Sequence, residues 1–255
     1  MRLSPSFWAR PFAHRGLHDK TAGRPENAMA AFDAAIAGGY AIELDVQVSA
    51  DGEAMVFHDY KMTRLTGESG IVSDRTAQDL RATALLGGGT IPDLETVLHR
   101  IDGRVCTLIE IKDQSGAFGP TDGALERRVC DIVRASGHAA TCAIMSFNPH
   151  SVLAVRDAAP EIRRGIVSYD FEHPHDAHIQ ADHRRALAEM AMFEECGADF
   201  VSYGADSLDT PPIVALRGRG VPVFTWTIRS AAQADAVSDH CDQITFENFL
   251  PPMDA

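Results

Sequence analysis

The chain lacks three features that mark common classes of protein. Its uninterrupted apolar runs fall far short of the roughly 20 residues that a membrane-spanning helix needs. Its five cysteines are odd in number, scattered, and never spaced as Cys-x-x-Cys, which argues against a disulfide framework or a zinc ribbon. Residues 1–10 lack the apolar stretch of a signal peptide. We therefore expect reduced thiols and a cytoplasmic protein with no stable membrane insertion.

Positive charge is also scarce. The formal net charge of −13 argues against an extended surface for nucleic acid or anionic membrane, because both need an excess of Lys and Arg. We expect no nucleic-acid partner. A few local cations can still reverse the potential inside a pocket, so a small anionic substrate fits this composition. The oligomeric state is left open by the sequence.

Strand-like and helical patterns alternate along the chain. Short apolar runs cover 12–14, 41–48, 54–58, 106–112, 142–147, 164–168, 200–203, 221–228 and 243–246. Amphipathic helical spacing covers 27–38, 94–101, 123–136, 149–158 and 210–218, and a further helix is expected over 186–196. Asn27 and Asn148 are expected helix starts, and Gly38-Gly39 and Gly137 expected stops. The alternation predicts an α/β protein with parallel strands and crossover helices.

The number of strands favours a closed barrel. If 54–58 is a hairpin return, eight staves remain in 255 residues, which is the size of a (β/α)8 TIM-type barrel. An open doubly wound sheet is the alternative, but the Gly-x-Gly-x-x-Gly fingerprint is missing after the first strand. We predict one domain over 1–255, with a small polar, Gly-rich insertion at 60–92 over the barrel mouth.

A second irregular stretch, 171–185, is rich in histidine. A metal site there is one interpretation, and a solvated loop leading into the next helix is the preferred one. The histidines are His173, His175, His178 and His183.

Two carboxylates end the second predicted strand. Glu43 and Asp45 are two residues apart, so their side chains point to the same face. Asp51-Gly52 is a strong two-residue hairpin signal, and such a turn would place Asp45 directly opposite His58. We therefore expect two acids and an imidazole in one patch, suited to metal binding and proton transfer.

Other strands carry polar residues at the same end. His14-Arg15-Gly16 ends the first strand, and Glu110 and Lys112 interrupt a later one. Taken singly, each could be an exposed charge or half of a salt bridge. Charges inside apolar strands are unfavourable unless paired or metal-bound, and active sites of (β/α)8 enzymes lie at the carboxyl ends of the strands. The repetition on separate strands therefore favours one shared site.

The residue types at these ends suit phosphodiester cleavage. Three carboxylates without thiolates make an oxygen site that prefers Mg²⁺ or Ca²⁺ to Zn²⁺. Arg15 and Lys112 can hold phosphate oxygens. With both cations and a divalent metal present, a singly charged phosphodiester would leave the pocket neutral. His14 and His58 can act as general acid and base.

These residues occur in motifs by which the chain resembles the glycerophosphodiester phosphodiesterase family. The ordered pieces span nearly the whole chain and are His14-Arg15-Gly16, Pro25-Glu26-Asn27, Ile42-Glu43-Leu44-Asp45-Val46, Asp51-Gly52, Val56-Phe57-His58-Asp59, 91–98, Ile109-Glu110-Ile111-Lys112, Ser146-Phe147 and Thr225-Trp226-Thr227. One departure is 243–248, Gln-Ile-Thr-Phe-Glu-Asn, where the family more often has Gly-Ile-Ile-Thr-Asp; Glu247 keeps an acid there.

The resemblance implies a barrel with an insertion after His58 and a set of functional residues. It implies a divalent metal on Glu43, Asp45 and Glu110, an acid–base pair of His14 and His58, and phosphate contacts from Arg15 and Lys112. Glu26 is expected near the site, with a first-turn acid that favours the helix dipole as the alternative. Trp226 is expected to wall the substrate pocket, with a plain core or rim aromatic as the alternative.

The expected activity is metal-dependent hydrolysis of a small glycerophosphodiester, such as glycerophosphocholine or glycerophosphoethanolamine, to glycerol 3-phosphate and an alcohol. A lysophospholipid hydrolase of the same barrel family is the nearest alternative, although the insertion has few grouped apolar residues. A non-catalytic phospho-ligand-binding barrel would lack part of the acid–base and metal set, which is complete here. A metal-dependent amidohydrolase usually needs a His-x-His pair, and Gly16 stands where the second histidine would be.

Overall fold

The predicted barrel is confirmed. The computed structural model describes residues 3–253, and within them eight parallel strands close into a ring, each hydrogen-bonded to the next and the last to the first. In ring order the strands are β1 (Phe12–Ala13), β2 (Ala41–Val48), β4 (Thr107–Ile111), β5 (Cys142–Ser146), β6 (Arg163–Ser168), β7 (Phe200–Gly204), β8 (Val223–Ile228) and β9 (Gln243–Phe246). Strand β3 (Ala54–Val56) lies outside the ring, antiparallel to β2.

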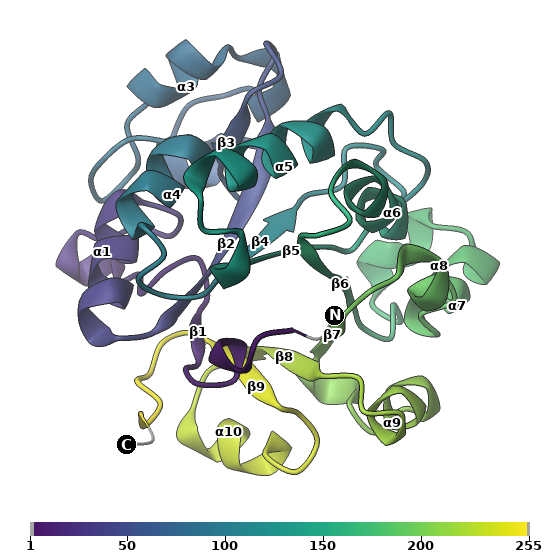
Figure 1. Ribbon diagram of the computed structural model, residues 1–255. Helices are drawn as coiled ribbons and strands as arrows, with labels where there is room; N and C mark the ends of the chain where they lie inside the picture. Colours follow the sequence, from purple (N-terminus) through teal and green to yellow (C-terminus); the bar gives the residue numbers. More distant parts are fainter. Residues whose placement is uncertain (1–2, 254–255) are drawn as a thin grey trace.

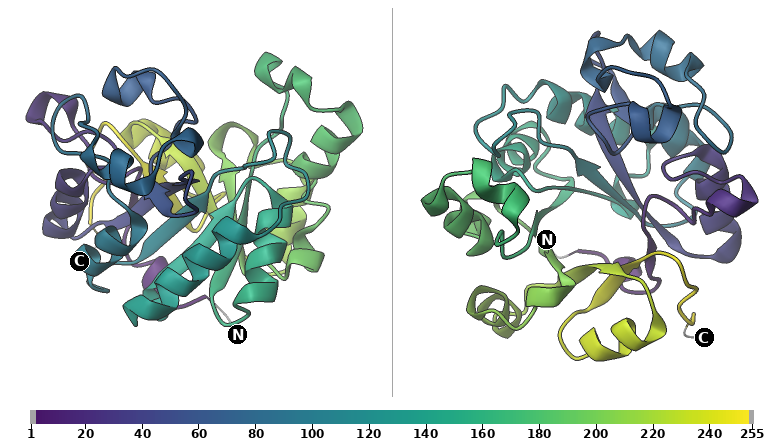
Figure 2. Two further views of the ribbon diagram at one scale, coloured as in Figure 1. Left: turned by 90° about the horizontal axis from the view of Figure 1, so that it is seen from above. Right: turned by 180° about the vertical axis from the view of Figure 1, so that it is seen from behind.

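Helices surround the ring (Figure 1). They are α1 (Met29–Gly38), α2 (Thr63–Thr66), α3 (Ala77–Ala82), α4 (Leu94–Ile101), α5 (Ala124–Ser136), α6 (Pro149–Ala158), α7 (Ala181–Ala188), α8 (Phe193–Cys196), α9 (Pro211–Gly218) and α10 (Ala231–Val237). The two further views show the same arrangement from above and behind (Figure 2). Between residues 3 and 253, no helix is both long and apolar enough to cross a membrane.

Alternation along each strand sorts side chains between the inside and the outside of the barrel. Outward-facing residues such as Ile42, Leu44 and Ile109 belong to the large core cluster shared with the surrounding helices. Inward-facing residues form a second cluster near the amino ends of the strands, made of Phe12, Ala41, Leu108, Ala143, Phe200 and Phe224 with neighbours. Because the inward positions continue two residues at a time, the same faces carry His14, Glu43, Asp45, Glu110 and Lys112 at the carboxyl ends.

The amino-terminal segment closes the apolar end of the barrel. Phe7 is fully buried in the inner cluster, and its ring centroid lies 6.3 Å from that of Phe12. Phe224 packs against Phe12 at 5.6 Å and against Phe200 at 5.1 Å. With aromatic rings filling this end, the opposite end is left for polar groups and a ligand.

Most predicted boundaries agree with the structure to within two residues. The helices 94–101 and 149–158 have the predicted limits, and Asn148 caps the second by accepting from the His150 amide. Gly39 and Gly137 both end helices in the left-handed region, with φ of 73° and 75°. These agreements arise where the local pattern and a capping residue point to the same boundary.

Four details of the prediction were wrong. Asn27 does not start a helix; Ala28 caps α1, and Asn27 has a positive φ of 57°. The helix expected over 186–196 is two helices, α7 and α8, separated near Met190, which has a φ of 57°. Because α7 begins at Ala181, the expected loop over 171–185 is partly helical. Helix α10 was not predicted, because Val237 is its only apolar residue larger than alanine.

The hairpin register is also one residue away from the predicted one. Val46 pairs with Val56 and Gln47 with Met55, so Asp45 lies opposite Phe57 and not His58. The loop has three residues, because the Ser49 amide donates to the Glu53 carbonyl and Gly52 adopts a φ of 84°. A three-residue hairpin with glycine in the left-handed position is the common alternative to a two-residue turn.

The insertion at 60–92 is structured and has a buried cluster of its own. It holds α2 and α3, and its apolar residues, including Met62, Leu65 and Leu80, form a separate buried cluster. Met55 and Phe57 of the hairpin and Ala28 before α1 complete that cluster. The insertion is thus packed directly onto the segments that carry His58 and Glu26.

We predict that Gly165→Ala destabilises the barrel by about 1 to 3 kcal/mol. A Cβ at Gly165 would lie 2.4 to 2.7 Å from ring atoms of Phe200, which is fully buried in the inner cluster and has no space to move. Urea denaturation measures the loss. The control is Gly218→Ala in α9, where an added Cβ meets no atom within 4 Å; equal stability of the two variants would contradict this packing.

Candidate active site

Three carboxylates converge at the carboxyl end of the barrel. Glu43 and Asp45 of β2 and Glu110 of β4 offer oxygen atoms that all lie within 4.8 Å of one another, and all three residues are buried. Asp45 pairs in register with Glu110 across the two strands. The sequence prediction that these three acids meet is confirmed.

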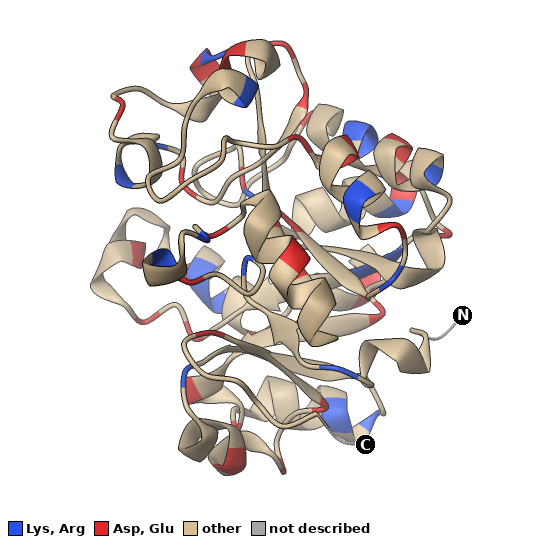
Figure 3. Cartoon of the chain, turned by 90° about the vertical axis from the view of Figure 1, so that its left-hand side faces the viewer, with Lys and Arg blue, Asp and Glu red and all other residues tan. Residues whose placement is uncertain are grey.

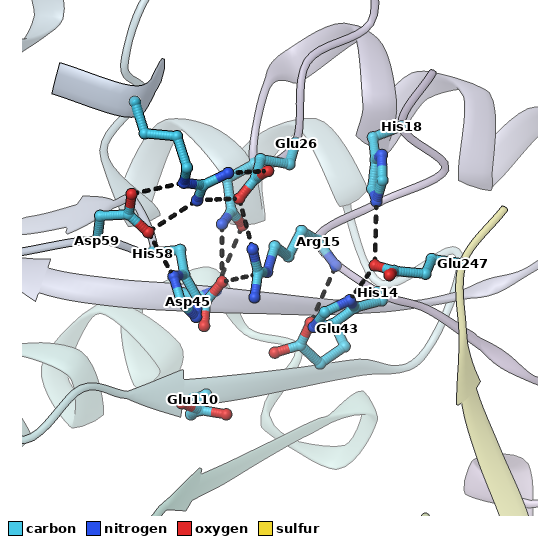
Figure 4. Close-up of polar contacts among 12 residues, drawn as sticks. His14, Arg15, His18, Glu26, Glu43, Asp45, His58, Asp59, Glu110 and Glu247 are labelled. Atoms are coloured by element: carbon cyan, nitrogen blue, oxygen red, sulfur yellow. Dashed lines mark hydrogen bonds and ion pairs between the residues drawn. The ribbon is translucent and has the colours of Figure 1, made fainter. Parts of the chain in front are cut away.

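The turn after β1 wraps Arg15 around this cluster (Figure 4). Arg15 has a φ of 55°, and its amide donates to Glu43 Oε2 at 2.9 Å while its Nε lies 3.4 Å from Asp45 Oδ2. Gly16 follows with a φ of 78°, and a Cβ there would lie 2.9 Å from the Ala31 Cβ. The His-Arg-Gly sequence therefore reflects a turn that only glycine can complete against α1.

Asn27 fixes Asp45 from the opposite side. Its Nδ2 donates to Asp45 Oδ2 at 2.8 Å, and its Oδ1 accepts from the Asp45 amide at 3.3 Å. The Asn27 amide donates to the Arg15 carbonyl at 2.9 Å. The Pro-Glu-Asn segment thus holds both a carboxylate of the cluster and the arginine beside it.

A carboxylate contacts each of the two predicted histidines. His14 Nδ1 lies 2.7 Å from Glu247 Oε2, and His58 Nδ1 lies 2.7 Å from Asp59 Oδ1. An ionised carboxylate only accepts hydrogen bonds, so each Nδ1 carries the proton and each Nε2 is left for the cavity. A guanidinium completes each set: Arg229 Nε donates to Glu247 at 2.7 Å, and Arg64 Nε to Asp59 at 2.6 Å.

His18 also contacts Glu247, with its Nε2 3.6 Å from Oε2. His14, His18 and Glu247 therefore form a second group whose ligand atoms lie within 4.8 Å. Hydrogen bonds from the two histidines hold the pKa of Glu247 well below its usual range. Because Arg229 already balances this carboxylate, the geometry favours orientation of His14 over metal binding.

Glu26 joins the two halves of the site. It accepts from Arg15 at 2.6 Å and from both terminal nitrogens of Arg64 at 2.7 and 2.8 Å. Although burial opposes ionisation, the Arg64 and Arg15 guanidinium groups lower the pKa of Glu26 to about 2. A continuous chain of ion pairs therefore runs from His58 through Asp59, Arg64 and Glu26 to Arg15.

The pKa values of Glu43 and Asp45 shift in opposite directions. Burial, together with the nearby Asp45 and Glu110, raises the pKa of Glu43 well above its usual value. Burial also opposes ionisation of Asp45, but His58, Lys112 and Arg15 outweigh it and lower that pKa. Lys112 Nζ lies 2.6 Å from Glu110 and 3.3 Å from Asp45, which raises the lysine pKa despite its burial.

This cluster fits a divalent cation. Three like charges in a buried site repel one another, and burial together with this repulsion raises the pKa of Glu43. All the ligand atoms are oxygens, which suits a hard cation such as Mg²⁺ or Ca²⁺. Glu43, Asp45 and Glu110 are thus the residues that could hold such an ion.

A narrow cavity of about 200 Å³ unites the predicted residues. The three acids, both histidines, Arg15, Lys112 and Trp226 all line it. The buried Nε of Arg15 lies 3.4 Å from Asp45 Oδ2 and makes no hydrogen bond to a described residue. Glu26 does not line this cavity; it lies behind Arg15. Because α1 begins at Met29, Glu26 is not in the first turn of that helix, and the alternative role as a first-turn acid is wrong.

A wider cleft of about 1250 Å³ opens beside the narrow cavity. His58, Glu110, Lys112, Phe147, Trp226 and Arg229 line both. Its remaining walls come from the insertion, from the segments after β6 and β7, and from α10. Figure 3 shows acidic and basic residues interspersed over the chain, so the local charge near the site comes from individual pairs.

The sequence did not predict three side chains that contact the carboxylates beside the histidines, namely His18, Arg64 and Arg229. Arg64 lies in an insertion whose packing no periodicity reveals, and Arg229 reaches Glu247 only because β8 and β9 are neighbours. Glu247 was noticeable as the acid two residues beyond Thr245, on the inward face of β9. The predicted residues of the histidine-rich stretch are not among the metal-ligating groups of the described chain.

Comparison with known proteins agrees with this geometry. The model of the glycerophosphoryl diester phosphodiesterase family matches residues 14–243. The chain belongs to this family. It is 28% identical over 230 residues to the Bacillus subtilis protein YhdW, covering 87% of each chain. It is 30% identical over 177 residues to the glycerophosphodiester phosphodiesterase of Bacillus altitudinis, covering 66% of this chain and 70% of that protein.

A solved structure supports the fold of this phosphodiesterase. The chain aligns with a phosphodiesterase of Oleispira antarctica that was solved in complex with its product sn-glycerol-3-phosphate. The TM-score is 0.75 at 19% identity, and the alignment covers 95% of this chain and 94% of the other. Together with the family match, this identifies the chain as a phosphodiesterase enzyme with the family's barrel.

The lowered pKa of Glu26 predicts a pH-dependent loss of stability. A folded pKa of about 2 lies below the ordinary value of 4.5, so the stabilisation is complete above pH 4.5 and is lost as the pH falls toward 2. Between pH 6 and pH 3.5, wild type should lose about 1 to 1.5 kcal/mol more than Glu26→Gln. Urea denaturation at the two pH values measures this; Asp209→Asn, at an exposed acid, is the control, and it should behave as wild type. Parallel losses in Glu26→Gln and wild type would contradict the assignment.

Proposed function

We propose that this enzyme hydrolyses glycerophosphodiesters, such as glycerophosphocholine or glycerophosphoethanolamine, to glycerol 3-phosphate and an alcohol. One observation carries the proposal: three carboxylates, two imidazoles and two cationic side chains line the same narrow cavity. The names of the relatives and the product bound to the Oleispira phosphodiesterase support the same substrate class.

The activity should depend on a divalent cation held by Glu43, Asp45 and Glu110. When bound, the cation would draw charge from a phosphate oxygen and so favour attack at phosphorus. Lys112 and Arg15 flank the same acids and would take the remaining phosphate oxygens. Glu26 would then act by positioning Arg15.

The two histidines would divide the proton transfers. His14 lines only the narrow cavity, and burial lowers its pKa, which favours the neutral imidazole that a general base requires. His58 lines both the narrow cavity and the wide cleft, so its doubly protonated form would give the Nε2 proton to the leaving alcohol there. The nucleophile is either water or the glycerol 2-hydroxyl, the second giving a cyclic phosphate that water then opens. Phosphorus NMR under single-turnover conditions distinguishes the two routes.

We propose that residues 1–255 act as one domain. The insertion at 60–92 supplies Arg64 to the site and Tyr60, whose hydroxyl donates to the Asp113 carbonyl at 2.6 Å. These contacts support the insertion as part of the barrel mouth.

The five cysteines are free thiols, which supports a reducing, cytoplasmic setting.

The direct test is incubation of the purified protein with glycerophosphocholine, with and without a chelator, followed by an assay for glycerol 3-phosphate. We expect product only when the metal is available, and restoration by Mg²⁺ or Ca²⁺. Lysophosphatidylcholine is the competing substrate. Faster turnover of the lysophospholipid, or no product from any diester, would overturn the proposal.

His14→Ala and His58→Ala should each lower kcat by roughly 10² to 10⁴, because each removes one proton transfer. Steady-state kinetics measures the loss, and circular dichroism checks that the fold is intact. His240→Ala, at an exposed position in the turn after α10, is the control and should retain full activity. Near-normal kcat in either site variant would remove that histidine from the mechanism.

Glu110→Gln should weaken Mg²⁺ or Ca²⁺ binding about tenfold or more, because it removes one of three charged ligands. Titration calorimetry measures the affinity, and thermal unfolding without metal should change far less. Glu95→Gln, at an exposed acid of α4, is the control. Unchanged metal affinity in Glu110→Gln would place the third ligand elsewhere.

A further inference from the structure

Three aromatic rings form a corner at the boundary between the narrow cavity and the wide cleft. Phe147, Tyr169 and Trp226 lie at the carboxyl ends of β5, β6 and β8. Their centroids are 5.3 Å apart for Phe147 and Trp226, 6.0 Å for Phe147 and Tyr169, and 6.1 Å for Tyr169 and Trp226. The interplanar angles are 84°, 84° and 80°, so the rings are nearly perpendicular to one another, like three faces meeting at the corner of a box.

The corner is held rigidly and remains partly exposed. All three rings are only half-buried, and all three line the wide cleft. The Tyr169 hydroxyl donates to Asp176 at 2.6 Å, its ring stacks on Phe171 at 4.2 Å, and the Trp226 indole donates to the Ser202 carbonyl. Rings fixed in this way can receive a ligand without first being ordered.

A glycine keeps the space between the strands open. Gly204 ends β7, which lies between β6 and β8, and it pairs with Trp226. A Cβ at Gly204 would lie 3.0 Å from the Tyr169 Cβ. Any larger residue would therefore press on the tyrosine that forms one face of the corner.

Acidic side chains without ionic partners border the same cleft. Asp170, Glu172 and Asp206 are exposed on its wall, and none of them is in an ion pair with a described residue. Asp170 makes only neutral hydrogen bonds, accepting from the Ser207 hydroxyl and the Glu172 amide. Three lysine and arginine residues lie on the cleft wall: Lys112 and Arg229 already pair with Glu110 and Glu247, and Lys61 is exposed and in no ion pair with a described residue. The unpaired carboxylates therefore outnumber the unpaired cation.

We propose that this corner is the subsite for the leaving alcohol and that it selects a cationic one, a quaternary ammonium such as choline. An organic cation is attracted to the faces of aromatic rings, and its charge is balanced by nearby carboxylates. A neutral alcohol such as glycerol gains neither interaction. The inference rests on the proposed function, because it assigns the part of a glycerophosphodiester beyond the phosphate to the wide cleft next to His58.

The first test measures binding and needs no turnover. Choline and 3,3-dimethylbutan-1-ol have the same shape, but only choline is charged. NMR titration of the whole protein should give an affinity for choline about tenfold higher than for the neutral alcohol, in line with a desolvated cation–π contact. Equal affinities, or no saturable choline binding, would overturn the proposal.

The second test compares kcat/KM for glycerophosphocholine and glycerophosphoglycerol. Wild type should prefer the choline ester about tenfold. Tyr169→Leu keeps apolar volume but removes a ring face, and Asp206→Asn removes only a charge; each should reduce the preference to about threefold or less. Tyr169→Phe keeps the ring and should keep the preference.

Asp209→Asn is the matched control for charge, since Asp209 is exposed nearby but is not on the cleft wall. It should leave both rates unchanged. If neither diester is hydrolysed, the proposed function fails, and the binding test alone decides the subsite. If both are hydrolysed equally well, the proposed function stands and the choline subsite is overturned.

Discussion

The site depends on the balance between three buried carboxylates and the two cations beside them. Carboxylate oxygens of Glu43, Asp45 and Glu110 lie within 4.8 Å of one another inside the barrel, where like charges repel strongly. Arg15 and Lys112 lie beside these acids, yet burial and the neighbouring Asp45 and Glu110 still raise the pKa of Glu43. A divalent cation would complete the compensation and leave both cationic side chains available to an anionic substrate.

This balance requires a rigid frame, and the barrel supplies it by alternation. Inward positions at one end of the strands hold Phe12, Phe200 and Phe224, and the same faces at the other end hold the charged groups. The aromatic end excludes water and anchors the strands. The polar end therefore gains a fixed geometry that isolated surface charges do not have.

Two parallel arrangements then orient His14 and His58. In each, a guanidinium binds a carboxylate that binds the Nδ1 of a histidine. Arg64 supplies one of these guanidinium groups from the insertion and also binds Glu26. The insertion therefore contributes one side chain to these contacts and also packs on neighbouring segments. The aromatic corner of Phe147, Tyr169 and Trp226 lines the wide cleft, which His58 lines too.

Local patterns determined the elements wherever propensity and burial agreed. The barrel strands were recognisable because each is a short apolar run bounded by turn residues, and α4 and α6 because apolar spacing and capping coincide. The break between α7 and α8 and the short helix α10 were not recognisable, because packing against neighbours decides them. The predicted hairpin register was wrong for a similar reason. Asp51-Gly52 suits a loop of two or of three residues, and the pairing of Val46 with Val56 selects the three-residue loop.

The sequence by itself determined which side chains are polar within apolar strands, and hence the three carboxylates, both histidines and the Arg15–Lys112 pair. Only the tertiary structure decided their partners, because Glu247, Arg64, Arg229 and the aromatic corner come from segments that are distant along the chain. Spacing of two residues fixes the face on which a side chain lies in a strand. Contacts between segments depend on how the ring closes, and no local pattern encodes that closure.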